Sequence, residues 1–483
     1  MDPLKAAGSA GPPPTKSVIT VLALVCAAQF ILQLDFSVVN VALPTIQREL
    51  EFAPAELQWI VTGYALTFGS LLLLGGRLGD LLGRRRLLWL GLGCFAIASL
   101  TCGLSISAPM LIGARLVQGA AAALVSPSAL SLVTAGTPEG PVRNRALSLF
   151  QAATAAGASA GVVAGGFIVD LLGWRWIFLV NVPIVAVLLL LIPGVIANDA
   201  AHRHPRLDVM GAALATASGA ALIFGLSHGQ QSGFATAATV LSLLAAAGAA
   251  AAFVVVERRV GDPMLPFRYF REPTHRAAIG ATALVGAITV SYPYFVSLYL
   301  QYVLRYSPLL TGLALLPSPV TVIVVSVALT KRAVDRLGVK WVLLLGLALI
   351  AAGQLWLSQL DLSRGYLLNV LPGQILTASG VALSLPATAI GASSGVAGSE
   401  QGIASGLLNA ARQMGGAGGL AIFATVAAAW TVRTGSLSAG YALSYLAATG
   451  VALVGVFWVA TRLNHTVCQA ELARQRAAER AGS

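Results

Sequence analysis

Gly76-Arg-Leu-Gly-Asp80-Leu-Leu-Gly83-Arg84-Arg85-Arg86 is a short polar break between two long apolar runs of the sequence. A similar break, Asp335-Arg-Leu-Gly338-Val-Lys340, follows another apolar run 255 residues later. A second matching pair, Phe52-Ala-Pro54 and Tyr306-Ser-Pro308, is separated by 254 residues. Two matches with nearly the same offset indicate that the chain contains two related halves.

The composition excludes several classes of protein. Of the 483 residues, 57% are hydrophobic and only 10% are charged, whereas a soluble domain carries about 25% charged residues. We therefore exclude a soluble enzyme, a disordered chain and a secreted disulfide scaffold. The net charge of +12 does not indicate nucleic-acid binding, because the basic residues lie in short gaps between apolar runs and form no basic face.

The apolar runs predict an all-α polytopic membrane protein. A bilayer core about 30 Å thick needs about 20 apolar residues per helix, and the runs do not alternate as strands of a membrane barrel would. Fourteen runs have this length: 18–42, 57–78, 87–106, 109–134, 147–171, 175–197, 209–228, 235–256, 277–304, 309–330, 339–359, 366–391, 403–431 and 440–461.

The repeat arranges these fourteen helices as 6+2+6. Parallel six-helix halves related by an axis along the membrane normal are a transporter architecture. The predicted organisation is a disordered cytoplasmic tail (1–17), an N-terminal six-helix bundle (18–197), two inserted helices with cytoplasmic flanking loops (198–276), a C-terminal six-helix bundle (277–461) and a cytoplasmic tail (462–483).

The loop charges predict the orientation. With the N-terminus in the cytoplasm, 23 Lys and Arg residues fall inside and 5 fall outside, as the positive-inside rule requires. The predicted cytoplasmic loop 392–402 contains neither Lys nor Arg, so its charge does not indicate on which side of the membrane it lies. We expect a multi-pass protein of the cell membrane with both termini in the cytoplasm.

Three motifs carry a resemblance to a known family. The break at Gly76–Arg86 resembles the loop signature of the major facilitator superfamily, although Leu81 stands where that pattern usually has a basic residue. Leu34-Asp35-Phe-Ser-Val-Val-Asn40-Val-Ala-Leu-Pro44 and Gly173-Trp-Arg175-Trp176-Ile-Phe-Leu-Val-Asn181-Val-Pro183 resemble motifs of its fourteen-helix drug:proton antiporter branch. The resemblance implies the major facilitator fold and export of amphipathic drugs or antibiotics by alternating access. The proton gradient would be the energy source, with no cofactor.

Asp35 and Arg115 are the candidate proton-coupling residues. A charge inside an apolar run costs about 2.5–3.5 kcal/mol on insertion scales, so Asp35 should face a cavity or a cationic partner. A partly desolvated carboxylate can load and release a proton near neutral pH. Arg115-Leu-Val-Gln118-Gly119 resembles the family's arginine motif, and Arg115 is a candidate partner for Asp35. The alternative is a purely structural acid and a structural or snorkelling arginine.

Two further motifs are candidates for conformational roles. By resemblance, Gly76, Asp80, Gly83, Arg84 and Arg85 form a gating loop; the alternative is a positive-inside anchor. Gly157, Gly161, Gly165 and Gly166 resemble the antiporter motif, with Val162 in place of its proline. Small residues at this spacing also suit ordinary close helix packing.

Candidate substrate-cavity residues are spread over three predicted helices. They are Asn40, Tyr292, Phe295, Tyr299, Asn409, Arg412 and Gln413. The aromatic cluster 292–302 fits either a wall for flat amphipathic ligands or an interface belt with core packing. Arg412 lies inside an apolar run, so it needs a partner or a water cavity, and Asp35 or a bound anionic group is a candidate partner. The alternative is an interdomain packing helix with a snorkelling arginine.

The sequence shows no pattern for a metal site, a phosphate-binding loop or a catalytic insertion. We predict a transporter and not an enzyme, with a small amphipathic substrate, protons and the bilayer as partners. No nucleic acid and no obligate protein partner are expected. The alternative function for the same fold is a narrow-substrate metabolite exporter or a uniporter, which Val162 favours.

Overall fold

The computed structural model describes residues 16–53, 56–137, 141–196, 209–233, 235–260, 267–360, 365–394 and 401–463, and all regular structure in them is helical. The first half holds α1 (Lys16–Glu49), α2 (Trp59–Leu82), α3 (Arg84–Gly103), α4 (Ala108–Gly136), α5 (Pro141–Leu172), α6 (Trp176–Leu179) and α7 (Asn181–Val195). Two helices follow, α8 (Val209–Ser232) and α9 (Ala237–Glu257).

The second half is interrupted more often than the first. After the 3₁₀ turn η1 (Phe267–Arg271) it holds α10 (Pro273–Leu298), the π-helical turn η2 (Tyr299–Val303), α11 (Pro308–Leu315), α12 (Pro317–Val325), the π-helical turn η3 (Ser326–Thr330), α13 (Lys331–Leu337), α14 (Val339–Leu357), α15 (Gly365–Asn369), α16 (Leu371–Ser393), α17 (Gln401–Thr434) and α18 (Leu437–Arg462).

The predicted helical runs agree closely with these helices. Among the described residues, twelve segments are long and apolar enough to cross a membrane. The two remaining predicted runs correspond to α2 and α8, whose apolar stretches, Trp59–Leu72 and Ala213–Leu222, are shorter. The all-α membrane fold is therefore confirmed, while the count of fourteen spans stays a prediction for those two helices.

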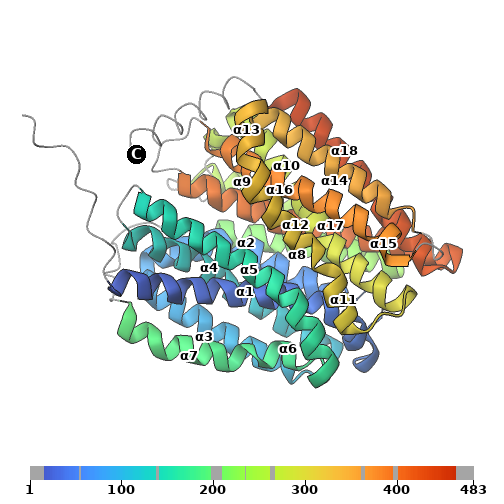
Figure 1. Ribbon diagram of the computed structural model, residues 1–483, viewed down its shortest axis with the longest axis horizontal. Coiled ribbons are helices and arrows are strands. Elements are labelled where there is room, and N and C mark those ends of the chain that lie inside the picture. Colours follow the sequence, from blue (N-terminus) through green and yellow to red (C-terminus); the bar gives the residue numbers. More distant parts are fainter. Residues whose placement is uncertain are drawn as a thin grey trace, which may run out of the picture.

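The two halves repeat the same packing (Figure 1). In the first half α1 packs on α5, α2 and α3 pack on α4, and α3 packs on α7. In the second half α10 packs on α17, α12 and α14 pack on α16, and α14 packs on α18. Each of these contacts of the first half has its counterpart at the equivalent place in the second, which is the geometry that a duplicated six-helix unit requires.

The repeated polar breaks also adopt the same conformation. Gly83 and Gly338 end α2 and α13 with φ of 89° and 82°, a region that only glycine enters without strain. Just beyond each glycine a basic side chain binds the end of the half's last helix. Arg85 Nη2 donates to Pro193 O (3.2 Å), and Lys340 Nζ donates to Ala460 O (2.8 Å). We call the end of the bundle with these two turns the proximal face, and the opposite end the distal face.

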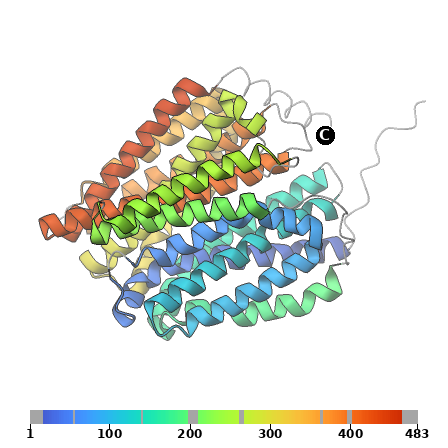
Figure 2. The same cartoon turned by 180° about the vertical axis from the view of Figure 1, so that it is seen from behind.

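Two seams join the halves. At one, α2 packs on α17; at the other, α5 packs on α11. The inserted helix α8 packs on both α2 and α17, so it covers the first seam, and α9 packs on α8 (Figure 2). Gly219 of α8 fits the notch between the halves, because a Cβ built on it would lie 2.8 Å from Leu66 Cδ1 and 3.2 Å from Met414 Cε.

Several predictions concern residues outside the described part of the chain. These predictions concern the N-terminal tail up to residue 15, the flanking segments 197–208 and 261–266, the loop 395–400 and the tail from residue 464. The side chain of Asp80 also lies outside the described part. The first helix begins at Lys16, two residues before the predicted boundary.

Candidate functional site

The first site is a buried ion pair inside the first half. Arg115 Nη1 lies 2.8 Å from Asp35 Oδ2, and neither side chain is exposed. Asp35 lies in the middle of α1 and Arg115 in the first half of α4, and α1 packs on α4. The structure thus pairs Asp35 with the cation that the sequence offered as its partner, and the functional role of the pair stays a prediction.

Amide groups complete the shell around the Asp35 carboxylate. Asn181 Nδ2 donates to Asp35 Oδ1 over 2.6 Å, and Gln118 Nε2 donates to the same oxygen over 2.8 Å. Gln118 also accepts from Arg115 Nη1 (2.7 Å) and donates to Ser99 Oγ (2.7 Å). The carboxylate therefore accepts three hydrogen bonds from α4 and α7. A buried charge needs such hydrogen-bond partners to offset the loss of its hydration.

Arg115 is held by further contacts. Its Nε donates to Ile60 O of α2 over 2.9 Å. Its guanidinium lies over the rings of Tyr64 and Phe178, at 4.5 and 5.7 Å from their centroids. Arg115 Nη2 has no hydrogen-bond partner among the described residues. Residues of α1, α2, α4 and α6 all contact this one cation. A change in the position of Arg115 would therefore alter contacts with four helices of the first half.

Sequence reasoning missed the role of the motif that contains Trp174 and Asn181. Its closely spaced tryptophans are typical of an aromatic belt at an outer membrane interface, which is what the sequence predicts for them. Trp176 is exposed, as a belt residue would be, but Trp174 is buried and its Nε1 donates to Glu49 Oε2 over 2.8 Å. Asn181, from the same motif, reaches Asp35. The signal was present, since a polar Asn in an apolar run requires an internal partner.

The glycines of the antiporter-like motif let α5 approach two helices. A Cβ on Gly161 would lie 2.5 Å from Leu34 O and 3.0 Å from Leu34 Cα of α1. Gly157 and Gly165 face the same helix, against Phe30 and Val38. Gly166 faces the other half, where a Cβ would lie 2.7 Å from Pro308 O of α11. The motif is thus a packing surface for α1 and for one seam.

The arginines of the predicted gating loop bind within their own half. Arg84 Nη1 donates to Ser131 O of α4 over 3.4 Å, and Arg85 Nη2 binds the end of α7 as described above. Gly76 lies near Pro127 of α4. These contacts anchor the proximal turn, and a gating role for it stays a prediction.

The structure does not bring the predicted substrate-cavity residues together. Tyr292 and Tyr299 are buried in the second half. Arg412 Nη2 donates to Asn409 Oδ1 over 3.1 Å, so its described polar contact is with its own helix, while Asp35 is engaged by Arg115. The remaining three, Asn40, Phe295 and Gln413, lie where the two halves meet.

Three hydrogen bonds join α1 to α10 and η2 near the distal face. Ser297 Oγ donates to Asn40 O (2.6 Å), and Gln301 Nε2 donates to Val41 O (2.9 Å). Tyr302 OH donates to Gln47 Oε1 (2.6 Å). We call this row the distal latch, because it ties the first helix of one half to the first helix of the other.

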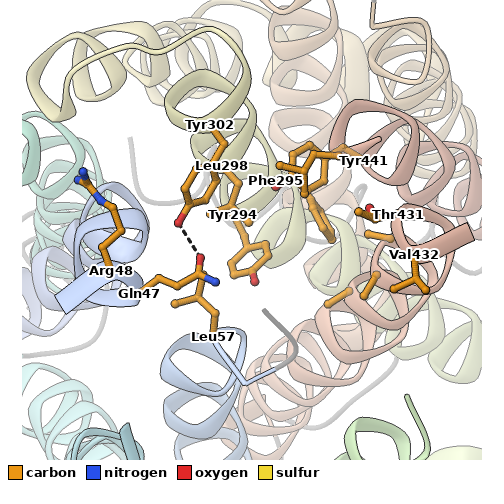
Figure 3. A pocket seen from close by; sticks show the side chains of 14 residues that line it. Gln47, Arg48, Leu57, Tyr294, Phe295, Leu298, Tyr302, Thr431, Val432 and Tyr441 are labelled. Carbon is orange, nitrogen blue, oxygen red and sulfur yellow. Dashed lines mark hydrogen bonds between the residues drawn. The ribbon is translucent and has the colours of Figure 1, made fainter. Parts of the chain in front are cut away.

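A cavity of about 480 Å³ lies beside the distal latch (Figure 3). One side is formed by Gln47, Arg48 and Leu57 of the first half. The other side is formed by the second half, with aromatic residues from α10, η2 and α18 and small apolar residues from α17. Its volume lies within the usual range for a small-molecule site. We call it the seam cavity.

Comparisons with known proteins agree with this architecture. Residues 25–420 match the model of the Major Facilitator Superfamily. Among solved structures, a peptide transporter is similar with a TM-score of 0.67 at 16% identity, covering 92% of this chain and 95% of that one. A bacterial homologue of the human lysosomal transporter Spinster has a TM-score of 0.63 at 15% identity, covering 95% and 99%. These likenesses show the fold.

The sequence relatives are more similar. The cephamycin export protein of Amycolatopsis lactamdurans is 38% identical, over 92% of this chain and 90% of that protein. A puromycin resistance protein of Streptomyces alboniger is 35% identical, over 94% and 92%. A lincomycin resistance protein of Streptomyces lincolnensis is 34% identical, over 84% and 83%. The chain is an integral membrane protein of transporter type, and it belongs to the Major Facilitator Superfamily.

Proposed function

We propose that this protein exports amphipathic drugs or antibiotics across the cell membrane in exchange for protons, by alternating access of its two halves. The relatives named for cephamycin export and for puromycin and lincomycin resistance support the substrate class. The buried pair of Asp35 and Arg115 is the observation that supports proton coupling. The charge asymmetry of the loops supports cytoplasmic termini.

The geometry suggests how the pair would couple to transport. A buried carboxylate is stable in its charged form only while a cation and hydrogen-bond donors surround it. If movement of the halves draws Arg115 away through its contacts with α2, Asp35 loses its counter-charge and takes up a proton. Return of Arg115 expels the proton. Each cycle would then carry a proton through the first half as the substrate leaves.

The proton gradient is the proposed energy source, and no cofactor enters the cycle. Asn181 and Gln118 act as positioning residues, because each holds the Asp35 carboxylate oriented toward Arg115. The two seams supply the surfaces over which the halves would rock. In the structure the distal latch is closed, so the halves are joined at that face.

The test is proton flux in proteoliposomes that carry an imposed pH gradient, with cephamycin, puromycin and lincomycin among the added compounds. Substrate-dependent collapse of the gradient is expected for the wild type and is expected to be lost in Asp35→Asn. The matched control is Asp170→Asn, which makes the same change at an exposed acid of α5.

Two outcomes would contradict the proposal. Full coupling in inserted Asp35→Asn protein would remove Asp35 from the mechanism. Substrate movement without any proton flux in the wild type would favour the uniporter that Val162 suggests, and movement of a single metabolite class alone would favour the narrow-substrate exporter.

A further inference from the structure

The seam cavity is separate from the ion-pair network and has its own chemistry. Its walls come from α1, α10, η2, α17, α18 and the segment before α2, and none of the residues that bind Asp35 lines it. Any ligand that filled it would touch both halves at once. It would also lie against Tyr302 and Gln47, whose hydrogen bond belongs to the distal latch.

The cavity walls suit a flat, largely apolar molecule. Tyr294, Phe295, Tyr302 and Tyr441 present aromatic rings to it (Figure 3). Phe295 packs edge-on against Tyr294, with 5.1 Å between centroids, and tilted against Tyr441 at 5.8 Å, so the rings hold each other in place. Alanines of α17 line the cavity as well, among them Ala428, and leave room for a planar ring system.

The cavity has a single charged lining residue, Arg48. Its exposed guanidinium donates to Pro44 O (3.3 Å) and Thr45 Oγ1 (3.5 Å). Arg48 belongs to neither the pair of Asp35 with Arg115 nor the pair of Glu49 with Arg175, and no carboxylate contact is found for it among the described residues. A guanidinium without a carboxylate partner is complementary to a carboxylate or sulfonate of a ligand.

We propose that the seam cavity binds planar aromatic anions, with the ring system among the four aromatic side chains and the acidic group on Arg48. The Arg48 guanidinium lies back along α1, away from the rings (Figure 3), so binding includes a change of its side-chain rotamer toward the cavity. Because such a ligand contacts both halves across the closed distal latch, it stabilises the latched conformation. A ligand that binds one conformation better than the other shifts the population toward it. The same compound therefore slows any cycle that requires the latch to open.

The binding test uses purified protein in detergent and does not depend on transport. A variant with Cys26, Cys94, Cys102 and Cys468 replaced by alanine carries one new thiol, Ala428→Cys, which lies in the cavity wall. The rate at which a water-soluble maleimide modifies this thiol is measured with increasing 2-naphthalenesulfonate, and then with the cation 2-naphthyltrimethylammonium.

The sulfonate is expected to slow modification at least fivefold at saturation, and the cation is expected to have little effect. Arg48→Gln should weaken protection by the sulfonate about tenfold, as loss of one charge-assisted hydrogen bond predicts. The matched control is Arg433→Gln, since Arg433 lies on α17 over Trp430 and does not line the cavity. It should leave protection unchanged.

A second measurement avoids the cysteine variants. The sulfonate should raise the melting temperature of the otherwise unmodified protein, and Arg48→Gln should remove that rise while Arg433→Gln keeps it. Equal protection by the cation, unchanged protection in Arg48→Gln, or no protection and no thermal shift at millimolar sulfonate would each overturn the proposal.

Discussion

The Asp35 carboxylate and the Arg115 guanidinium are 2.8 Å apart and wholly enclosed by the first half of the protein. The pair is therefore not a feature of the seam between the halves. The hydrogen bonds to the Asp35 carboxylate come from α4 and α7, and Arg115 connects the pair to Ile60 and Tyr64 of α2, the helix that packs on α17. Movement of α2 relative to α17 would therefore displace Ile60 and Tyr64, which contact Arg115 directly.

The energetics of this pair can be measured with a double-mutant cycle. Asp35→Asn leaves Arg115 buried without a counter-charge, which typically costs about 3–5 kcal/mol. Combining it with Arg115→Met removes the orphaned charge as well, so most of the lost stability should return. The readout is the melting temperature of each purified variant. Equal melting temperatures for the single and double variants would show that the charge is not the cause.

The exposed pair of Glu49 and Arg175 is the matched comparison for that cycle. Its N–O distance is 2.6 Å, but both side chains are more than 40% exposed. Such surface pairs contribute about 0–1 kcal/mol. Glu49→Gln should therefore change the melting temperature far less than Asp35→Asn does, although it also replaces the charged acceptor of Trp174 Nε1 by a neutral amide.

Close packing between α1 and α5 predicts a strong effect of a single methyl group. In Gly161→Ala the new Cβ meets the backbone of Leu34, which cannot move aside as a flexible side chain could. Overpacking of this kind typically costs about 1–3 kcal/mol, so a lower melting temperature and a lower yield of folded protein are expected. Gly93→Ala in α3 is the control, because a Cβ there meets nothing within 4 Å. Equal losses in both would contradict the packing argument.

Tyr302→Phe should loosen the distal latch. The change removes the hydrogen bond to Gln47, worth about 0.5–1.5 kcal/mol, and raises the ratio of open to closed conformations about two- to tenfold. Spin labels on Glu51→Cys and Arg433→Cys, one on each half, would report opening of the latch as a new population at longer distance between the two labels. In Tyr366→Phe, which loses a hydrogen bond to Ala314 inside the second half, the distance distribution should stay as in the wild type.

Because Gly219 fits a narrow space between α2 and α17, we predict that a large side chain at this position would push the two helices apart. Gly219→Ala meets only the mobile ends of Leu66 and Met414 and should be tolerated. Gly219→Leu is too large for the notch and should slow transport several-fold in proteoliposomes by holding α2 and α17 apart. Gly248→Leu on exposed α9, where a Cβ meets nothing, should transport at the wild-type rate. Similar slowing in both leucine variants would point to a general effect of α8–α9 instead.

The helices could be predicted from sequence because length and apolarity alone decide what spans a bilayer. The two halves could be predicted because Gly83 and Gly338 must each end a helix at positive φ, which preserves a visible pattern. Asp35 and Arg115 stood out for a similar reason, since each breaks an apolar run and needs a partner.

The sequence could not place residues whose importance depends on long-range packing. Trp174 resembled an interface residue, and only the position of Glu49 on another helix shows that it is buried. Asn181 and Ser99 meet at Asp35 because α7 and α3 happen to converge there. The seam cavity is lined by both Arg48 and Tyr441, which are nearly four hundred residues apart, and no local pattern predicts that they border the same cavity.

The cover that α8 provides makes the two sides of the molecule unequal toward lipid. At one side, α8 and α9 stand between the acyl chains and the contact of α2 with α17. At the other side, within the described part of the chain, α5 and α11 meet without an added helix of that kind. The two flanks of the molecule therefore present different surfaces to the acyl chains: the added pair of α8 and α9 on one side, and the direct contact of α5 with α11 on the other.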